Sequence, residues 1–374
     1  MTARSDTPAI VGFGSSTIER RSTRSITALA VDAAVAAVAD AGINKDDVDG
    51  YVGAPTATNA GALHVDGADE VSARHMIRAL GLTKIAWAVD LAKGFAPDMV
   101  LAAAQALQTR ACDAVLGVRA LYNLTGVSYG TKQVEQAFGD DQFLTPFGYS
   151  AMGARFATRA RRYLALSGAD RRDLFAVVAH ARRQARDNPL AVWRDRGVTL
   201  EEYLEAPMVA TPLCRLDCDM PVCGAAAFVM TRGDRDRTAP HRPVYIAGAA
   251  AWQRPQEIFD RARRNRADID FCQLYDGFSS MFYEWLEGLG WCAPNTAWKF
   301  VRDGNCERDG KLPANTFGGS LGEGRLHGIG HLREAVLQIS GRAGKRQLPN
   351  ADNGLVQVGP FDQSSFVILS ASPR

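Results

Sequence analysis

Three segments of the chain place titratable side chains and glycines next to expected strand ends. They span 274–279, 312–328 and 356–365. Each has the pattern of a strand, then a glycine-rich or polar loop, then a helix or another strand. In α/β sheets, loops of this kind converge on one crevice at the carboxyl ends of the strands. We therefore expect the segments to meet, with Tyr275, Arg325 and His327 as the side chains able to move or stabilise charge.

The elements that would position these loops alternate between strand and helix. Strands are expected at 9–14, 48–53 and 113–118, with helices at 25–41 and 99–109 between them. The second helix is rich in alanine and almost uncharged, so it should be buried on most sides. Strand, helix and strand with short connections predict right-handed βαβ units and a largely parallel sheet.

The pattern also indicates two related halves. A second series of elements begins near residue 243, and its segment 265–271 is similar to 44–50, because in both a polar turn with an aspartate leads into a strand. Arginine- and alanine-rich helices at 151–167 and 171–187 predict an insertion that covers one face of the sheet. The expected boundaries are 1–240 for the first half, 241–374 for the second, and about 120–212 for the insertion.

Composition excludes several classes of protein. The 374 residues carry 43 Lys and Arg against 41 Asp and Glu, a net charge of +2, which gives no electrostatic reason to expect nucleic acid or a membrane surface as partner. No apolar run reaches the ~18 residues of a spanning helix, and the N-terminus has no signal-peptide pattern. The seven cysteines have no metal-ligand spacing, so we expect no metal site and a reduced, cytoplasmic protein.

Together, the three loop segments resemble the thiolase superfamily, in its sterol-carrier-protein-type branch. The thiolase signature N-P-x-G-G…G-H-P-x-G is matched in form by Asn315, Gly318, Gly319 and the run 324–328. The resemblance covers most of the chain. It implies an α/β protein with the thiolase fold, which is a duplicated five-layer αβαβα sandwich, here with a helical insertion in the first half. It also implies a homodimer.

Departures from the thiolase pattern bear on the chemistry. A thiolase acylates a cysteine in the loop before the buried helix of its first half, but here that loop has Lys93 and no cysteine. Arg325 replaces the histidine of G-H-P, and Tyr275 replaces an Asn or His. The C-terminal loop, where thiolases have a second cysteine, contains Phe361 instead. With no thiol at either place, an acyl-enzyme route is closed.

The pattern Tyr-Asp-x-Phe-Ser, with Gly-Glu-x-x-x-His-Gly and the missing thiols, resembles the steroid side-chain-cleaving aldolases of this superfamily. The resemblance implies retro-aldol cleavage of a bulky β-hydroxyacyl-CoA to a ketone and propionyl-CoA or acetyl-CoA. It implies no cofactor beyond the coenzyme A of the substrate, and a partner protein with an OB-fold and zinc-ribbon domain. In those aldolases a second tyrosine stands where this chain has Arg325.

Such a cleavage needs a base for the β-hydroxyl proton and donors for the thioester oxygen. We expect Tyr275 to be the acid/base, with its pKa lowered by Arg325, and His327 to be a charge-stabilising donor. The structural alternative for Tyr275 is an aromatic ring packed under its loop. The structural alternative for Arg325 is a salt bridge to Glu323 or Asp276. Substrate-binding roles are expected for Lys93, Asp276, Phe278, Asn315, Gly318, Gly319, Gly328 and Phe361.

Several alternatives stay open at this point. Asp276 can instead cap its loop, and Lys93 is a candidate Schiff-base nucleophile. His331 is expected on the following helix, facing away from the site. The segment 249–267 is shorter than in thiolases, so the acyl pocket is either more open or completed by a partner. The chain can also be a non-catalytic acyl-CoA-binding or scaffold subunit, or an acyltransferase with an atypical nucleophile.

Overall fold

The computed structural model of the chain describes residues 7–55, 71–91, 94–124, 137–149, 151–233, 239–251, 255–360 and 363–373. Within these residues, nine strands form one mixed sheet in the order β3-β2-β4-β7-β1-β8-β11-β10-β9. The strands that precede residue 240 are β1 (Ala9–Ser15), β2 (Gly50–Gly53), β3 (Trp87–Asp90), β4 (Ala114–Leu121) and β7 (Gly224–Thr231). Those that follow it are β8 (Val244–Ala251), β9 (Phe271–Leu274), β10 (Asn353–Val358) and β11 (Ser365–Ser370).

The prediction of a largely parallel sheet is wrong. β2 runs parallel to β3 and β4, and β9 runs parallel to β10. However, β7 is antiparallel to both β4 and β1, and β11 is antiparallel to both β10 and β8. The reason is that β7 and β11 re-enter the sheet from the end at which β4 and β10 leave it, so the chain makes no crossover before the next pairing.

The sheet topology repeats along the chain, as the thiolase resemblance implied. The spatial order β2-β4-β7-β1 is matched by β9-β10-β11-β8. In the described part of the chain β3 has only a partial counterpart, a parallel bridge from Cys272 of β9 to Ala314. The two series join where β1 pairs with β8, with Ala9 opposite Tyr245.

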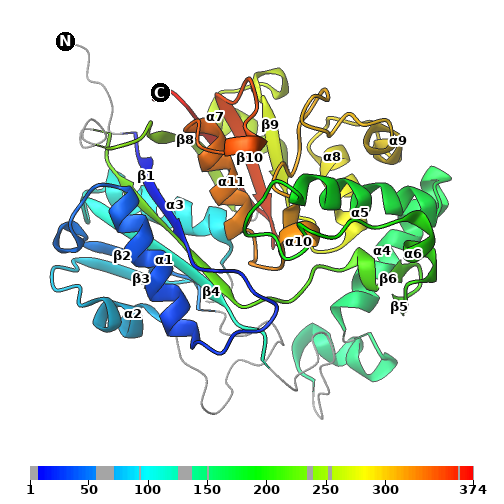
Figure 1. Cartoon of the computed structure of the whole chain (residues 1–374), viewed down its shortest axis with the longest axis horizontal. Coiled ribbons are helices and arrows are strands. Elements are labelled where there is room, and N and C mark those ends of the chain that lie inside the picture. The colour runs from blue at the N-terminus through cyan, green and yellow to red at the C-terminus, as the bar shows by residue number, and fades with distance from the viewer. Residues whose placement is uncertain are drawn as a thin grey trace.

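Two helices lie between the two strand series. α3 (Ala96–Gln108) packs on β2 and β4 and also on β8 and β11, and α11 (Ile329–Ile339) contacts α3, β9, β10 and β7. The predicted burial of the alanine-rich helix is confirmed, since Met99, Val100 and Ala103 have no exposed surface. On the outer faces, α1 (Ile26–Asp40) and α2 (Ala73–Leu80) cover one series and α7 (Pro255–Ala262) covers the other (Figure 1).

The outer helix α1 shows how the sequence sets the spacing of these layers. Its N-terminus is capped by Ser25, whose side chain accepts a hydrogen bond from the backbone of Ala28. The β1 glycines face the helix, and a Cβ at Gly14 would lie 2.4 Å from the Ala33 carbonyl oxygen. The small side chains therefore let helix and sheet approach more closely than larger ones would.

Between β4 and β7 the described residues form mainly helices. The helices predicted at 151–167 and 171–187 are confirmed as α4 (Met152–Ser167) and α5 (Arg171–Ala185). α6 (Leu200–Glu205) and the short strands β5 (Met208–Ala210) and β6 (Leu213–Cys214) follow. α5 packs against α8 (Ser279–Gly288), α9 (Ala297–Arg302) and α10 (Gly319–Glu323), so this segment lies beside the C-terminal loops (Figure 1).

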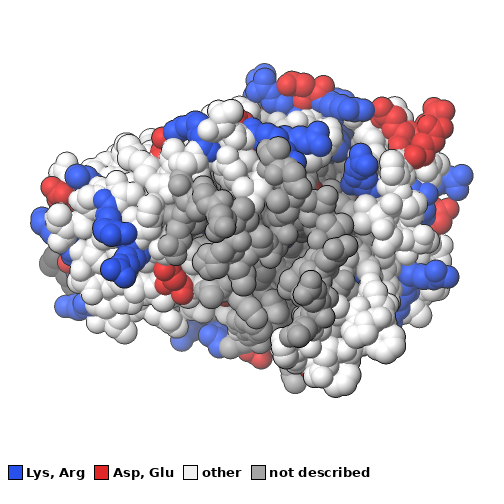
Figure 2. Space-filling view, turned by 90° about the horizontal axis from the view of Figure 1, so that it is seen from below, with Lys and Arg blue, Asp and Glu red and all other residues white. Residues whose placement is uncertain are grey.

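On one face of the molecule, charged side chains of both signs lie around the area drawn in Figure 2 as not described. On the face seen in Figure 2, Lys and Arg side chains are interspersed with Asp and Glu side chains, as a net charge of +2 leads one to expect. Across the described residues, no helix is both long enough and apolar enough to cross a membrane. The same residues contain no group of His, Cys, Asp and Glu side chains suited to hold a metal ion.

Candidate active site

The three loop segments meet, as the sequence predicted. The backbone N–H of Tyr275, directly after β9, donates to Oε1 of Gln357 in β10 at 3.1 Å. The side chain of Asn315 secures the same strand end, because its Oδ1 accepts from the Leu274 N–H at 2.7 Å and its Nδ2 donates to the Leu274 carbonyl at 2.8 Å. Both ends of the Asn315 amide are therefore used to hold β9.

Tyr275 and Arg325 both face a residue that the sequence interpretation missed, Asp219. The Tyr275 hydroxyl donates to Oδ2 of Asp219 over 3.5 Å, and Nε of Arg325 lies 3.8 Å from the same oxygen. Asp219 stands shortly before β7 and is buried. Its backbone N–H donates to the carbonyl of Gly277 at 3.1 Å, which fixes the carboxylate beside the Tyr275 loop.

The expected lowering of the Tyr275 pKa is wrong. Burial, followed by the negative charges of Asp219 and Asp276, holds the pKa of the Tyr275 hydroxyl well above its ordinary value. Burial and Asp276 also hold the pKa of the Asp219 carboxyl well above its usual range. Burial and the neighbouring Arg119 lower the pKa of Arg325 to about 9, so this guanidinium remains charged at neutral pH. Tyr275 is thus a protonated phenol, and its neighbour Asp219 binds a proton more strongly than an ordinary aspartate does.

His327 is held by a second residue that the sequence interpretation missed, Arg119 of β4. Arg119 is 2 % exposed, and it donates from Nη1 to the Gly94 carbonyl at 2.6 Å and from Nη2 to Nδ1 of His327 at 2.7 Å. A guanidinium has donors only, so Nδ1 must accept, and the ring proton of neutral His327 lies on Nε2. Burial, Arg325 and Arg119 hold the pKa of His327 well below its ordinary value. His327 is therefore a neutral donor at Nε2.

Asp276 and His331 order the loop that carries Tyr275. Oδ1 of Asp276 accepts from the Ser320 backbone N–H at 2.6 Å, at the start of α10. The expectation that His331 faces away is wrong: it is buried, and its Nε2 lies 3.3 Å from Asp276 Oδ1 and 3.2 Å from the Leu274 carbonyl oxygen. In the structure, Asp276 therefore has the contacts of a loop cap.

The remaining candidates mainly shape the loops around this cluster. Phe278 stacks on Phe156 with ring centroids 4.4 Å apart. Gly318 lies against α5, and Gly319 lies against the Asp276 carboxylate. Gly328 approaches Val358 of β10 so closely that a Cβ would come within 2.3 Å of it.

Lys93 and Phe361 lie outside the described residues. The adjoining Phe95 packs edge-on against His327, with ring centroids 6.2 Å apart. Glu323 is buried and forms an ion pair with Arg333, whereas Arg325 faces Asp219.

The two missed residues had sequence signals of different strength. Arg119 interrupts the apolar strand Ala114–Leu121, and a charged residue in a central strand needs a buried partner. Asp219 gave a weaker signal, because it stands in a polar turn where an aspartate is ordinary. Its position beside Tyr275 depends on a pairing between distant parts of the chain.

The chain is similar to known proteins over nearly its whole length. Residues 239–371 match the family model described as "Thiolase C-terminal domain-like". The 17-hydroxy-3-oxo-4-pregnene-20-carboxyl-CoA lyase of Mycobacterium tuberculosis is 32 % identical, over 96 % of this chain and 98 % of that protein. A steroid side-chain-cleaving aldolase of Thermomonospora curvata is 33 % identical, over 97 % of each chain.

The chain belongs to the steroid side-chain-cleaving aldolases of the thiolase superfamily. The solved structure of the Ltp2-ChsH2(DUF35) aldolase superposes on this aldolase-family chain with a TM-score of 0.86, 31 % identity and 98 % coverage of both chains. Acetyl-CoA acetyltransferase from Syntrophomonas wolfei shares the fold, with a TM-score of 0.70 at 16 % identity and coverage of 99 % of this chain and 100 % of the other. The thiolase fold and the aldolase branch predicted from the sequence are both confirmed.

Proposed function

We propose that this protein is a CoA-thioester lyase that cleaves a bulky β-hydroxyacyl-CoA, possessing a steroid-like acyl group, into a ketone and propionyl-CoA or acetyl-CoA. The near full-length likeness to two proteins named as a CoA lyase and an aldolase supports the reaction class. The observation that carries the proposal is the buried cluster in which Asp219 contacts both Tyr275 and Arg325 beside a neutral His327.

The state of the cysteines supports a route without an acyl-enzyme. Burial raises the pKa of all seven thiols. A thiol needs a lowered pKa or an adjacent base to act as a nucleophile near neutral pH. The acyltransferase alternative therefore has no activated thiol in this chain.

The proton of the substrate β-hydroxyl passes to the Asp219–Tyr275 pair. Since the pKa of Tyr275 is raised, its phenolate is not the resting base. Instead, the Tyr275 hydroxyl oxygen accepts the substrate proton while the Tyr275 proton moves to Oδ2 of Asp219. Because the pKa of Asp219 is raised, its carboxylate is a stronger base than that of an ordinary aspartate. The positive charge of Arg325 stabilises the anionic cluster that begins the reaction.

The carbon–carbon bond then breaks, and its electron pair moves to the thioester as an enolate. The Nε2–H of His327 donates to the enolate oxygen, and Arg119 keeps that proton on Nε2. The proton held by Asp219 then returns through Tyr275 to the enolate carbon, which gives the short acyl-CoA and leaves Asp219 as a carboxylate again. The cycle uses no cofactor beyond the coenzyme A of the substrate.

The assembly is part of the same proposal. The superposed aldolase structure pairs Ltp2 with ChsH2(DUF35), which supports a partner protein for this chain as well. We infer that the partner carries the OB-fold and zinc-ribbon domain implied by the family resemblance, and that the chain forms a homodimer through the thiolase fold. Size-exclusion chromatography with light scattering on the chain, alone and co-expressed with such a partner, measures both associations.

The proposal is tested by a cleavage assay on β-hydroxyacyl-CoAs with tertiary hydroxyls, with and without the partner. Mass spectrometry follows the ketone and the short acyl-CoA. Wild-type protein should release both products, and Tyr275→Phe should abolish turnover while it binds the partner normally. Equal rates for wild type and Tyr275→Phe would remove Tyr275 from the mechanism. A stable complex that cleaves no substrate would favour a scaffold role instead.

A further inference from the structure

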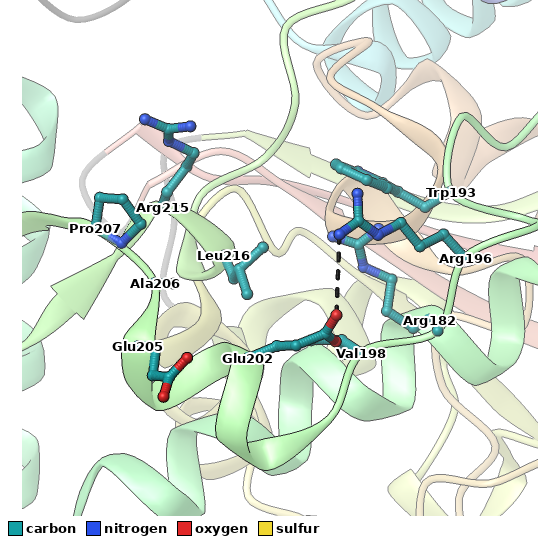
Figure 3. Close-up of a pocket in the computed structure, with 11 residues that line it drawn as sticks. Arg182, Trp193, Arg196, Val198, Glu202, Glu205, Ala206, Pro207, Arg215 and Leu216 are labelled. Carbon is teal, nitrogen blue, oxygen red and sulfur yellow. Dashed lines mark ion pairs between the residues drawn. The ribbon is translucent and has the colours of Figure 1, made fainter.

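A cavity of about 390 Å³ lies in the helical segment between β4 and β7, and none of its lining residues belongs to the active-site cluster. α5, the loop after it, α6 and the turn at residues 215–216 form its walls (Figure 3). Its charged lining residues are Arg182, Arg196, Arg215, Glu202 and Glu205. The three arginines exceed the two glutamates by one positive charge.

Arg182 is the residue that makes this cavity unusual. It is only 5 % exposed, and its guanidinium stacks on the Trp193 ring at 3.6 Å from the centroid. Within the described residues, its Nε and Nη1 groups are buried and have no hydrogen-bond partner. Burial, followed by the positive charge of Arg196, lowers the pKa of Arg182 to about 9, so it is still charged at neutral pH. A buried cation with two unused donors is costly unless an anion joins it.

The neighbouring acidic groups compensate this charge only in part. Arg196 lies at the exposed rim, and its Nη2 is 3.9 Å from Oε1 of Glu202. Glu202 also caps α6, because its Oε2 accepts from the Thr199 N–H at 2.9 Å. Figure 3 shows the Arg182 and Arg196 guanidinium groups side by side next to Trp193, with Arg215 across the cavity. Two positive charges placed in this way repel each other, and an anion between them would offset the repulsion.

We propose that this cavity binds the phosphate monoester of a small molecule. Guanidinium groups donate charge-assisted hydrogen bonds to phosphate oxygens, and the Nε and Nη1 donors of Arg182 have no hydrogen-bond partner among the described residues. The apolar side chains of Leu216 and Pro207 face the remainder of the cavity and can contact the carbon part of the ligand. The backbone of Trp193 is held in place, because its backbone N–H donates to the Gly322 carbonyl at 3.3 Å.

The phosphate monoester has two possible sources. One is the 3′-phosphate of a coenzyme A substrate, in which case the site rests on the proposed lyase function. The other is a free phosphorylated metabolite, which requires no particular reaction at the active site. The binding chemistry is the same for both sources, so the experiment has to separate them.

Isothermal titration of the full chain with inorganic phosphate tests the site itself. Arg182→Met and Arg196→Ala should each bind phosphate at least about tenfold more weakly than wild type, since each loses a charge-assisted contact. Arg194→Ala is the matched control: Arg194 is a nearby exposed arginine that pairs with Asp195 and does not line the cavity. Circular dichroism should show that all three variants are folded. Equal affinities in the four proteins, or no phosphate binding to wild type, would overturn the proposal.

Coenzyme A and dephospho-coenzyme A then identify the source. If the site holds the 3′-phosphate, wild type should bind coenzyme A at least about tenfold more tightly than the dephospho form, and Arg182→Met should remove this difference. If the ligand is a free phosphate compound, phosphate and coenzyme A should bind without competition. Either result supports the site. Because phosphate binding is measured without turnover, a failed cleavage assay and a failed phosphate titration overturn different proposals.

Discussion

Arg119→Met should change both the protonation of His327 and the rate of cleavage. Methionine has a similar length and suits the apolar surroundings of β4, but it has no charge and no donor. The substitution removes the 2.7 Å hydrogen bond to His327 Nδ1 and the 2.6 Å hydrogen bond to the Gly94 carbonyl. The neutral His327 ring is then free to carry its proton on either nitrogen.

The size of the effect follows from the bond that is lost. A hydrogen bond from a charged donor contributes about 1.5–3 kcal/mol, which corresponds to a decrease of about 10- to 150-fold in kcat/KM if the donor at Nε2 acts only in the transition state. The substitution also removes one of the two positive charges that lower the pKa of His327. The pKa of His327 should therefore be higher in the variant. As the pH falls, the His327 ring should become partly protonated in the variant while it stays neutral in wild type.

Nitrogen-15 NMR of histidine-labelled protein measures this directly. The chain has six histidines, and His327→Gln identifies the signal of interest. Wild-type His327 should show the Nε2-protonated neutral form without titration between about pH 6 and 8, whereas Arg119→Met should show mixed forms that titrate. Arg159→Met, at an exposed arginine paired with Glu284, should leave the His327 signal unchanged. A wild-type His327 that titrates near pH 6.5, or an Arg119→Met protein that is slower without any change at His327, would refute the reasoning.

Three further substitutions follow from the structure. Asp219→Asn should abolish turnover. The folded-state pKa of this carboxyl is raised, so the stability that it contributes at low pH is lost as the pH rises through that pKa. The variant should therefore have a higher free energy of unfolding than wild type at pH 7 in urea titrations. Gly319→Ala should destabilise the protein by about 3 kcal/mol or more, since a Cβ would lie 2.1 Å from a carboxylate oxygen of buried Asp276. Gly344 has a similar φ of 61° and open space around it, so Gly344→Ala should cost only about 1–2 kcal/mol. Burial alone would raise the pKa of Glu307, but hydrogen bonds, first from His180, lower it to about 2; Glu307→Gln should therefore reduce stability by about 1–3 kcal/mol at pH 7 and weaken the loss of stability as the pH falls from about 4.5 towards 2.

Each of these expectations can fail in a distinct way. An Asp219→Asn protein that is less stable than wild type at pH 7 would show that the carboxylate is well solvated or paired. Equal unfolding free energies for Gly319→Ala and Gly344→Ala would show that the loop yields without cost. An unchanged acid-unfolding profile for Glu307→Gln would assign the acid sensitivity to other carboxyl groups.

The sequence was informative where the signal is local. The glycine-rich loops, the buried helix and the segments around Tyr275 and Asn315 could be located, because periodicity and turn residues report on short stretches of chain. Whether neighbouring strands pair parallel or antiparallel could not be predicted in this way. Whether β7 pairs parallel or antiparallel with β4 depends on where the chain returns after about a hundred intervening residues.

The same limit explains why the sequence predicted the wrong direction for the pKa shift of Tyr275. Its sequence neighbourhood suggested Arg325 as the charge that would set its pKa. In the fold, the hydroxyl faces Asp219, which reaches it from a turn before β7, and burial adds to the effect of that carboxylate. A pKa depends on the charges that surround a group in space, and the sequence order does not give them.

The two missed residues show how the repeated fold serves the proposed chemistry. Arg119 and Asp219 come from the N-terminal strand series, whereas Tyr275 and His327 come from loops of the C-terminal series. Burial raises the pKa of Asp219 and lowers that of His327, so the site contains a carboxyl that binds a proton more strongly than an ordinary aspartate beside a neutral imidazole donor. Groups whose pKa values are moved apart in this way can act as base and as hydrogen-bond donor in a single step. Arg325, which stays charged, contacts the carboxylate and lowers the pKa of the histidine, so an arginine at this position supports both roles.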